Sequence, residues 1–346
     1  MHEPRRRAVL KDVAERAGVS LTAVSLVLNG KAGTNIAKET QARILAAAEE
    51  LGYRPNAMAR GLRSGRSATI GFISDEIATT PFAGAMIQGA QEAAWEAGRL
   101  LLLINTGHDR AIEATGLELL QERHVEGIIY ATMYHQVIEP PAILREGPAV
   151  LLDARAPNGS LPSVVPDEFG AARKATLELI RAGHRRIAFL QDHEPIAAVP
   201  ERESGYRSAL QEHGLSTPPE LIARGAATAA GGWQATLQLL ELPDSPTAVF
   251  CFNDQMAMGA YRAAAERGLR IPQDISIVGF DDQELIAPWL APGLTTMALP
   301  HFEMGCWAVK HLLALVDGQL PASVSPAQHR MPCPLVARES IAPPRS

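Results

Sequence analysis

The chain has 346 residues, of which 47% are hydrophobic and 20% are charged, so it can bury a sizeable core in two or three compact units. No apolar run approaches the roughly 18–20 residues that a membrane helix needs, and the basic N-terminus lacks the apolar segment of a secretory signal. These features predict a cytoplasmic protein with no membrane partner. The three cysteines lack CxxC spacing, which predicts reduced thiols rather than a disulfide frame or a metal site.

The net charge of −6 is unevenly distributed along the chain. Residues 1–66 hold 12 Lys and Arg against 6 Asp and Glu, giving +6, and the remaining residues hold 20 against 32, giving −12. A basic head on an acidic body predicts that the head alone binds a polyanion. A solvated charged terminus without a partner is the simpler alternative.

Residues 10–52 have the spacing of three short helices. In "KDVAERAGVSLTAVSLVLNGK", a small residue (Ala14) stands where two helices would cross, Gly18 suits a left-handed turn, and Ser20 can cap the next helix. The third helix lies in "KETQARILAAAEELGY" and ends at Gly52. This pattern predicts a helix-turn-helix whose second helix enters the major groove of DNA. A plain helical hairpin is the alternative, and the positive charge of the head disfavours it.

From Ala68 onward, apolar runs such as "ATIGFI", "LLLLIN" and "AVFCF" alternate with helical stretches. Continuous apolar strands separated by helices predict parallel sheets that are covered on both faces, and two sheets fit the number of runs better than one. An α/β enzyme has little support, because there is no P-loop, no GxGxxG after a strand and no GxSxG elbow.

Polar residues follow several of the predicted strands, where ligands bind in open parallel sheets. They are Asp153 after "PAVLL", Asn253 and Asp254 after "AVFCF", and Asp281 and Asp282 after "ISIVGF", with Arg202 at the start of a later helix. Asp254 and Asp282 could instead cap the helices that follow them. A divalent metal is not expected, because no EF-hand or HExxH spacing occurs.

The segment Lys11–Lys31 resembles the headpiece of the LacI/GalR family of bacterial transcription regulators. The likeness continues through "ETQARILAAAEELGYRPNAMARGLRSG" and "FNDQMAMGAYRAAAERGLRIPQDISIVGFDD" and covers nearly the whole chain. It implies an all-α helix-turn-helix headpiece, a hinge helix, and a two-lobed α/β core of the periplasmic-binding-protein type with three crossings between lobes. The implied bounds are 1–54 for the headpiece, 55–66 for the hinge, 67–165 and 299–320 for the N-lobe, and 166–298 and 321–346 for the C-lobe.

The resemblance also implies which residues contact DNA. Base-reading positions fall on Leu21, Thr22 and Leu26, phosphate positions on Ser20, Ser25 and Asn29, and hinge positions on Asn56, Leu62 and Arg63. Leu62 matches a leucine that is wedged into the minor groove, unless the segment is simply a disordered linker. Two positions depart from the family pattern. Leu26 stands where arginine is common, so Leu21 and Leu26 are expected either to contact thymine methyls or merely to exclude water. Ala37 replaces the serine that usually caps the third helix.

For the effector, the resemblance implies contacts from Asp153, Arg202, Asn253 and Asp281, with Trp233 over the apolar face of the ligand and Phe82 and His301 nearby. Carboxylates, an amide and an arginine can each hydrogen-bond to neighbouring hydroxyls, which favours a sugar or related polyol. A nucleoside or purine would stack on the same aromatic ring and remains an alternative. No cofactor or metal is expected beside this effector.

The implied function is a ligand-responsive, sequence-specific regulator, with repression as the family default and activation left open. It would act as a homodimer on pseudo-palindromic double-stranded operator DNA. The alternative is a sugar-binding protein without a DNA role, which the missing signal peptide and the basic head argue against. The identity of the effector, the direction of its effect and the operator sequence do not follow from the sequence.

Overall fold

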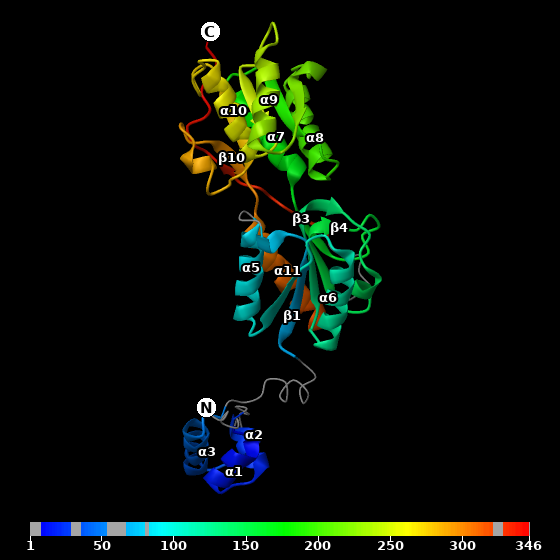
Figure 1. The fold of residues 1–346 in the computed structure, drawn as a ribbon, viewed down its shortest axis with the longest axis vertical. Coiled ribbons are helices and arrows are strands. Elements are labelled where there is room, and N and C mark those ends of the chain that lie inside the picture. Colours follow the sequence, from blue (N-terminus) through cyan, green and yellow to red (C-terminus); the bar gives the residue numbers. More distant parts are fainter. Residues whose placement is uncertain (1–7, 29–35, 54–66, 80–82, 321–327, 346) are drawn as a thin grey trace, which may run out of the picture. The chain divides into compact units, whose positions relative to one another are not determined.

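The chain forms two compact units, Met1–Ala68 and Thr69–Ser346, in a computed structural model (Figure 1). The structure describes residues 8–28, 36–53, 67–79, 83–320 and 328–345. The first unit is entirely helical where it is described, and the second holds two six-stranded sheets. The predicted fold class, an all-α headpiece followed by a two-lobed α/β core, is confirmed.

The first unit consists of three helices, α1 (Leu10–Ala17), α2 (Leu21–Leu28) and α3 (Lys38–Glu50). Their shared core is small and rich in alanine; it comprises Val13, Ala14, Ala17, Val24, Ile44, Ala47 and Ala48. Gly18 ends α1 with φ 66°, a backbone conformation that favours glycine. The Val19 amide then donates to the Ala14 carbonyl at 3.1 Å, which closes the turn between the two helices. The predicted helix-turn-helix is therefore present.

The starts of α2 and α3 differ in their capping. The Ser20 hydroxyl accepts a hydrogen bond from the Ala23 amide at 3.2 Å, as its position predicted. Ala37 precedes α3 and makes no side-chain cap. Instead, the Gln41 side-chain amide donates to the Ile36 carbonyl at 2.8 Å and fixes the chain that enters the helix.

The first lobe of the second unit is built on a fully parallel sheet with the strand order β11-β5-β4-β3-β1-β2. Its strands are β1 (Thr69–Ser74), β2 (Leu100–Asn105), β3 (Ile128–Val137), β4 (Ala149–Arg155), β5 (Ser163–Pro166) and β11 (Gln328–Met331). Helices α5 (Gly84–Glu96) and α11 (His301–Val316) pack together on one face, and α6 (Arg110–Glu122) covers the other. The apolar runs of the central strands are buried on both sides, as parallel sheets require.

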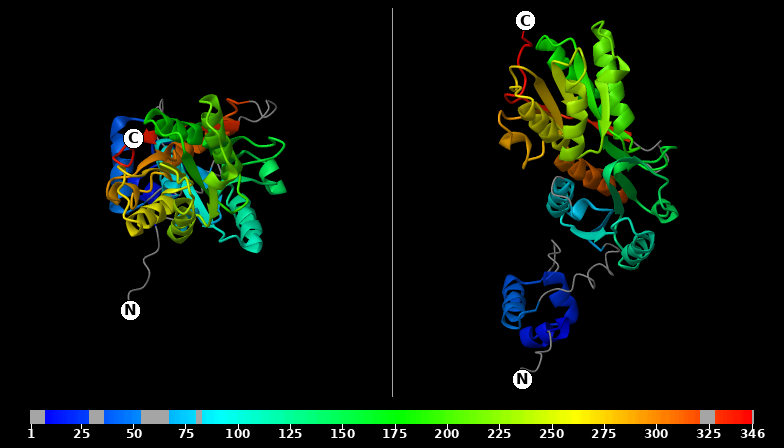
Figure 2. Two further views of the ribbon diagram at one scale, coloured as in Figure 1. Left: turned by 90° about the horizontal axis from the view of Figure 1, so that it is seen from above. Right: turned by 45° about the horizontal axis from the view of Figure 1, so that its top comes forward.

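The second lobe is likewise a sheet covered by helices (Figure 2), and its strand order is β12-β10-β9-β8-β6-β7. Its strands are β6 (Ile187–Asp192), β7 (Ile222–Gly225), β8 (Ala248–Cys251), β9 (Ser276–Asp281), β10 (Thr295–Ala298) and the antiparallel β12 (Leu335–Val336). Its helices pair as α7 (Glu168–Arg181) with α8 (Ala198–Glu212) and α9 (Ala229–Leu240) with α10 (Asp254–Glu266). The described part of the second unit also contains four 3-10 helices, at Ile77–Thr79, Ala142–Arg145, Pro219–Leu221 and Ala287–Trp289.

The chain passes between the lobes three times, after β5, after β10 and after β11. The third passage corrects the expected boundary, which assigned all of 321–346 to the C-lobe. Strand β11 pairs with β5 of the first lobe, with Gln328 opposite Ser163. The crossing therefore lies between Met331 and Leu335. The short sequence "QHRM" lacks an apolar run, so nothing in it indicated a strand.

Candidate functional site

Helix α2 presents one face away from the core of the headpiece. Leu21 and Thr22 are exposed, with 48% of Leu21 accessible, and Ser25 and Leu26 are half-buried one turn later. The opposite face, with Val24 as its centre, packs against the other helices. The helix carries no charged residue, so this outward face offers only hydroxyl and apolar groups to a base edge. Asn29, Asn56, Leu62, Arg63 and Phe82 lie outside the described residues, and their roles stay predictions.

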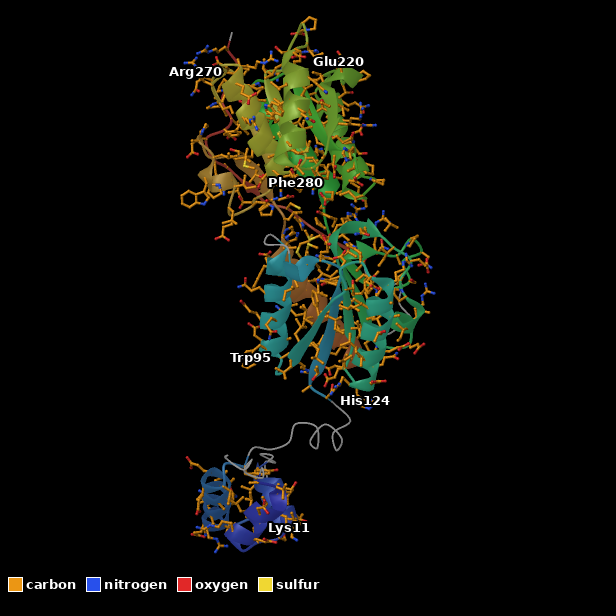
Figure 3. All side chains as sticks on the ribbon, viewed as in Figure 1. Lys11, Trp95, His124, Glu220, Arg270 and Phe280 are labelled. Atoms are coloured by element: carbon orange, nitrogen blue, oxygen red, sulfur yellow. The ribbon has the colours of Figure 1, made fainter. Side chains whose placement is uncertain are left out.

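A cleft of about 520 Å³ is lined by residues of both lobes of the second unit. It lies at the carboxyl ends of the parallel strands, because Asp153, Asp192 and Asp281 come from the ends of β4, β6 and β9. Figure 3 labels Phe280, the residue before Asp281, at the end of the second lobe that faces the first. The predicted residues Asp153, Arg202, Asn253, Asp281 and His301 all line this cleft.

Arg202 is the centre of the second-lobe wall and is only 4% exposed. Its guanidinium donates to both carboxylate oxygens of Glu168, at 2.6 and 3.3 Å, and to the Phe252 carbonyl. The guanidinium carbon of Arg202 lies over two aromatic rings, 4.3 Å from the centroid of the Phe252 ring and 3.6 Å from the centroid of the Phe280 ring. The Asp281 carboxylate oxygen Oδ1 lies 3.8 Å from a guanidinium nitrogen of Arg202. The buried cation is thus held by groups of the protein itself.

Burial shifts the pKa of Asp281 in this wall and of the neighbouring Asp254, which does not itself line the cleft. Burial raises the pKa of Asp281 to about 6, although Arg202 and a hydrogen bond from Gln283 oppose the rise. Burial also raises the pKa of Asp254, which accepts hydrogen bonds from the Thr296 hydroxyl and the Gln283 amide, both at 2.7 Å. A low dielectric disfavours the charged form of a carboxyl group, which explains both shifts.

Asn253 makes the cap that was considered for Asp254. Its side-chain oxygen accepts from the Met256 amide at 2.8 Å, and its side-chain nitrogen donates to the Ala227 carbonyl at 3.0 Å. The expectation that Asp254 could cap its helix is therefore wrong. Asn253 occupies the N-cap position, and Asp254 is already the first residue of α10. Asp282 is not a cap either, because it binds the Arg338 guanidinium at 2.7 Å.

The first-lobe wall of the cleft contains two buried polar side chains with unpaired atoms. Asp153 is 3% exposed, and its Oδ1 has no hydrogen-bond partner within the described chain. His135 is 2% exposed, and neither of its ring nitrogens has one. Burial raises the pKa of Asp153, with nearby Glu168 adding to the effect, and burial lowers the pKa of His135. Such orphaned polar atoms are costly in a native fold and point to a ligand.

Trp233 does not line the cleft, which corrects the prediction that it covers the ligand. Its indole nitrogen donates to Glu266 of α10 at 2.8 Å, and Arg262 lies over its ring at 4.7 Å. The physical reason is helix phase: α9 meets the cleft only at Thr228, the residue that caps it. One turn further on, the side chain at position 233 lies between α9 and α10.

The comparisons with known proteins agree with this geometry over both units. Residues 9–56 match the profile described as bacterial regulatory proteins, lacI family, and residues 67–339 match the profile of periplasmic binding proteins and the sugar-binding domain of the LacI family. The chain belongs to the LacI family. It is a ligand-responsive, DNA-binding transcription regulator and not an enzyme, which confirms the predicted class.

Individual members of the LacI family align along most of the chain. The HTH-type transcriptional repressor CytR of Escherichia coli (strain K12) is 35% identical over 96% of both chains. The NTD biosynthesis operon regulator NtdR of Bacillus subtilis is 31% identical over 96% of this chain and 99% of its own. The lac repressor dimer bound to operator and the anti-inducer ONPF superposes with a TM-score of 0.82 and 29% identity, over 97% of this chain and all of the other.

Some cleft residues of this LacI family member were missed in the sequence. Asp192 is the last residue of β6, whose sequence is "IAFLQD", and Glu168 follows the strand "SVVP", so the rule that found Asp153 could have found both. His135 follows no such rule, because it lies where the register of β3 against β4 shifts. Within the described residues no cluster of His, Cys, Asp and Glu could hold a metal, and no helix there has the length and apolarity to cross a membrane.

Proposed function

We propose that this protein is a cytoplasmic repressor that binds pseudo-palindromic operator DNA as a homodimer and changes its operator affinity when a small hydroxylated molecule, such as a sugar or polyol, enters the cleft. The observation that carries the proposal is the cleft itself. Both lobes line it, and its first-lobe wall holds buried polar atoms that have no hydrogen-bond partner among the described residues. CytR is named a transcriptional repressor, which supports repression as the direction of control.

Exposed apolar side chains support the homodimer. Strand β2 is the outer strand of its sheet and exposes Leu100, Leu102 and Leu103, and the neighbouring Trp95 is exposed on the surface of α5 (Figure 3). In the second lobe, Trp289 is 79% exposed. Apolar edge strands and large exposed aromatics are a liability unless a partner covers them. A second copy of the chain, whose headpiece would read the other half-site, fits that need.

The switch follows from linkage. A ligand that touches both walls of the cleft binds one arrangement of the lobes better than another, and it shifts the population toward that arrangement. Operator DNA that prefers one arrangement then changes ligand affinity by the same factor as ligand changes operator affinity. Ligand affinity that stays unchanged at saturating operator would contradict this mechanism.

The first experiment is selection of an operator from random double-stranded DNA, followed by gel shift at several salt concentrations. We expect a two-fold-related site, binding that weakens with salt, and at least one sugar or polyol that changes the affinity. Absent or salt-independent binding would contradict the proposal.

The same selection tests what the leucines of α2 read. Leucine packs on a thymine methyl but cannot donate to guanine, so we expect no strong guanine preference at the position facing Leu26. Leu26→Arg should shift that one position toward guanine by about 1–3 kcal/mol. A strong guanine preference in the unaltered protein would contradict this assignment.

A further inference from the structure

The cleft is strongly acidic. Its described lining includes five carboxyl residues and a single Lys or Arg, which is Arg202; the formal charge is −4 when every carboxyl group is ionised and the histidines are neutral. The carboxyl residues are Asp153, Glu168, Asp192, Glu194 and Asp281. Low-dielectric walls that carry one sign of charge concentrate ligands of the opposite sign.

The guanidinium of Arg202 is already occupied and is not free to bind an anionic group of a ligand. It donates to Glu168 and to the Phe252 carbonyl, and the two phenylalanine rings lie close to its central carbon. A phosphate or carboxylate on a ligand would have to displace Glu168 from a buried ion pair. Breaking such a pair is strongly unfavourable, because it leaves an uncompensated charge.

The first-lobe wall offers the opposite situation. Asp153 presents a buried oxygen without a hydrogen-bond partner, and its backbone is held at φ 55°, a conformation that a residue other than glycine rarely adopts. The Thr132 hydroxyl donates to the Asp153 carbonyl at 2.8 Å and helps to fix this geometry. A charge-assisted hydrogen bond from a cationic donor would satisfy the carboxylate and neutralise it at once.

His135 adds a second unpaired group to the same wall. A neutral imidazole has one donor and one acceptor nitrogen, which matches the donor and acceptor capacity of a hydroxyl. The two side chains together therefore suit a ligand that has both an amine and a hydroxyl.

We propose that the cleft takes a ligand that carries a protonated amine beside its hydroxyls, of the class of amino sugars and amino polyols, with Asp153 as the counter-charge of the amine and His135 as the partner of a hydroxyl. The proposal rests on the proposed function, because it names the chemical class of the molecule that switches operator affinity. It excludes phosphorylated sugars and other anions.

The test is isothermal titration and thermal shift of the full-length protein with matched probes. Each set holds a neutral sugar, its amine, its N-acetylated amine and its 6-phosphate, for glucose, galactose and mannose. We expect the amine of at least one set to bind, and its acetylated and phosphorylated counterparts to bind at least about tenfold more weakly, since loss of one charge-assisted bond is worth about 1.5–3 kcal/mol. A neutral or phosphorylated member that binds as tightly as its amine would overturn the proposal. So would the failure of every amine to bind at millimolar concentration.

Two variants locate the effect. Asp153→Asn keeps the shape of the side chain and should remove the preference for the amine over its neutral counterpart. Asp282→Asn is the matched control, because Asp282 binds Arg338 and does not line the cleft, and it should keep the preference. A preference that survives Asp153→Asn would overturn the assignment to Asp153. The comparison of amine with acetylated amine on the unaltered protein decides the ligand class even where a variant fails to fold.

Gel shift with the selected operator separates this inference from the proposed function. A neutral or phosphorylated ligand that changes operator affinity would overturn the amine class and leave the regulator intact. An amine that binds in the cleft without changing operator affinity would support the amine class and contradict the proposed switch.

Discussion

The two walls of the cleft treat their polar groups in opposite ways. On the second lobe, Arg202 is bonded to Glu168 and to a carbonyl, and Asn253 uses its amide oxygen and nitrogen on backbone groups. On the first lobe, Asp153 and His135 hold buried atoms that nothing in the described chain satisfies. The polar groups of the second-lobe wall are therefore paired by the fold itself, and we expect a ligand to supply partners for those of the first-lobe wall.

This difference separates stability from recognition within one site. A buried polar group that is fully paired adds rigidity, whereas an unpaired one costs free energy until a ligand supplies the partner. Substitutions on the second-lobe wall should therefore act mainly on folding. Substitutions of the unpaired groups on the first-lobe wall should act mainly on ligand binding and should raise the free energy of unfolding of the ligand-free protein.

The largest effect is expected from Arg202→Leu. Removal of the cation leaves Glu168 buried without a partner, which should lower the free energy of unfolding by about 3–5 kcal/mol, as measured in urea. The control is Arg173→Leu, which removes an exposed pair with Glu212 and should have a much smaller effect. Equal losses in the two variants would show that the second-lobe wall is not held by its buried pair.

The opposite sign is expected for Asp153→Asn in the ligand-free protein. Burial raises the pKa of Asp153 above its usual 3.8, so the folded state binds the proton more tightly than the unfolded state does. The stability that this carboxyl contributes is then full below about pH 4 and falls as the pH rises toward the raised pKa. Asparagine does not titrate, so the gain should reach about 1–3 kcal/mol and be larger at pH 8 than at pH 5. Urea unfolding at both values checks this, and a loss at pH 8 would contradict it.

A smaller loss is expected from Asn253→Ala, which removes the cap of α10. The expected cost is about 0.5–2 kcal/mol of unfolding free energy. Asn253→Ser should restore most of it, because a serine hydroxyl can accept the same bond from the Met256 amide. If both variants lose the same unfolding free energy, the stabilisation comes from the hydrogen bond between the Asn253 side-chain nitrogen and the Ala227 carbonyl, and not from the helix cap.

The smallest effect, on ligand affinity, is expected from Trp233→Ala, because Trp233 belongs to neither wall of the cleft. Because its ring contacts Arg262 and Glu266 rather than the cleft, ligand affinity should change by less than about twofold. A tenfold loss of ligand affinity, measured by titration, would show that Trp233 contributes to the ligand site and belongs to the second-lobe wall.

The sequence predicts the architecture because strand ends and helix phase leave periodic signals. Asp153 and Asp281 were found because the carboxyl ends of parallel strands meet at one edge of each sheet. Helical spacing also predicted that Val24 faces the core of the headpiece, whereas Leu21 and Leu26 were assigned to DNA only by the family resemblance. These features depend on local pattern, which the sequence carries directly.

The features that escaped prediction depend on tertiary detail. His135 reaches the cleft because β3 shifts register against β4, and a shift of register has no compositional sign. Trp233 matched an aromatic position by alignment, but its direction is set by how α9 packs on α10. That Arg202 is already occupied also could not be predicted, since its partner Glu168 is 34 residues away in the chain.

The three passages between the lobes, after β5, β10 and β11, constrain how the proposed switch can move. Two bodies joined by one tether can tumble freely, but three short tethers remove most twisting and sliding between them. We expect the motion that remains to be mainly the opening and closing of the cleft, as in other hinged two-lobed binding proteins. A ligand in the cleft would therefore act mainly on one variable, the degree to which the cleft is open. A partner bound elsewhere on the chain needs only to respond to that variable.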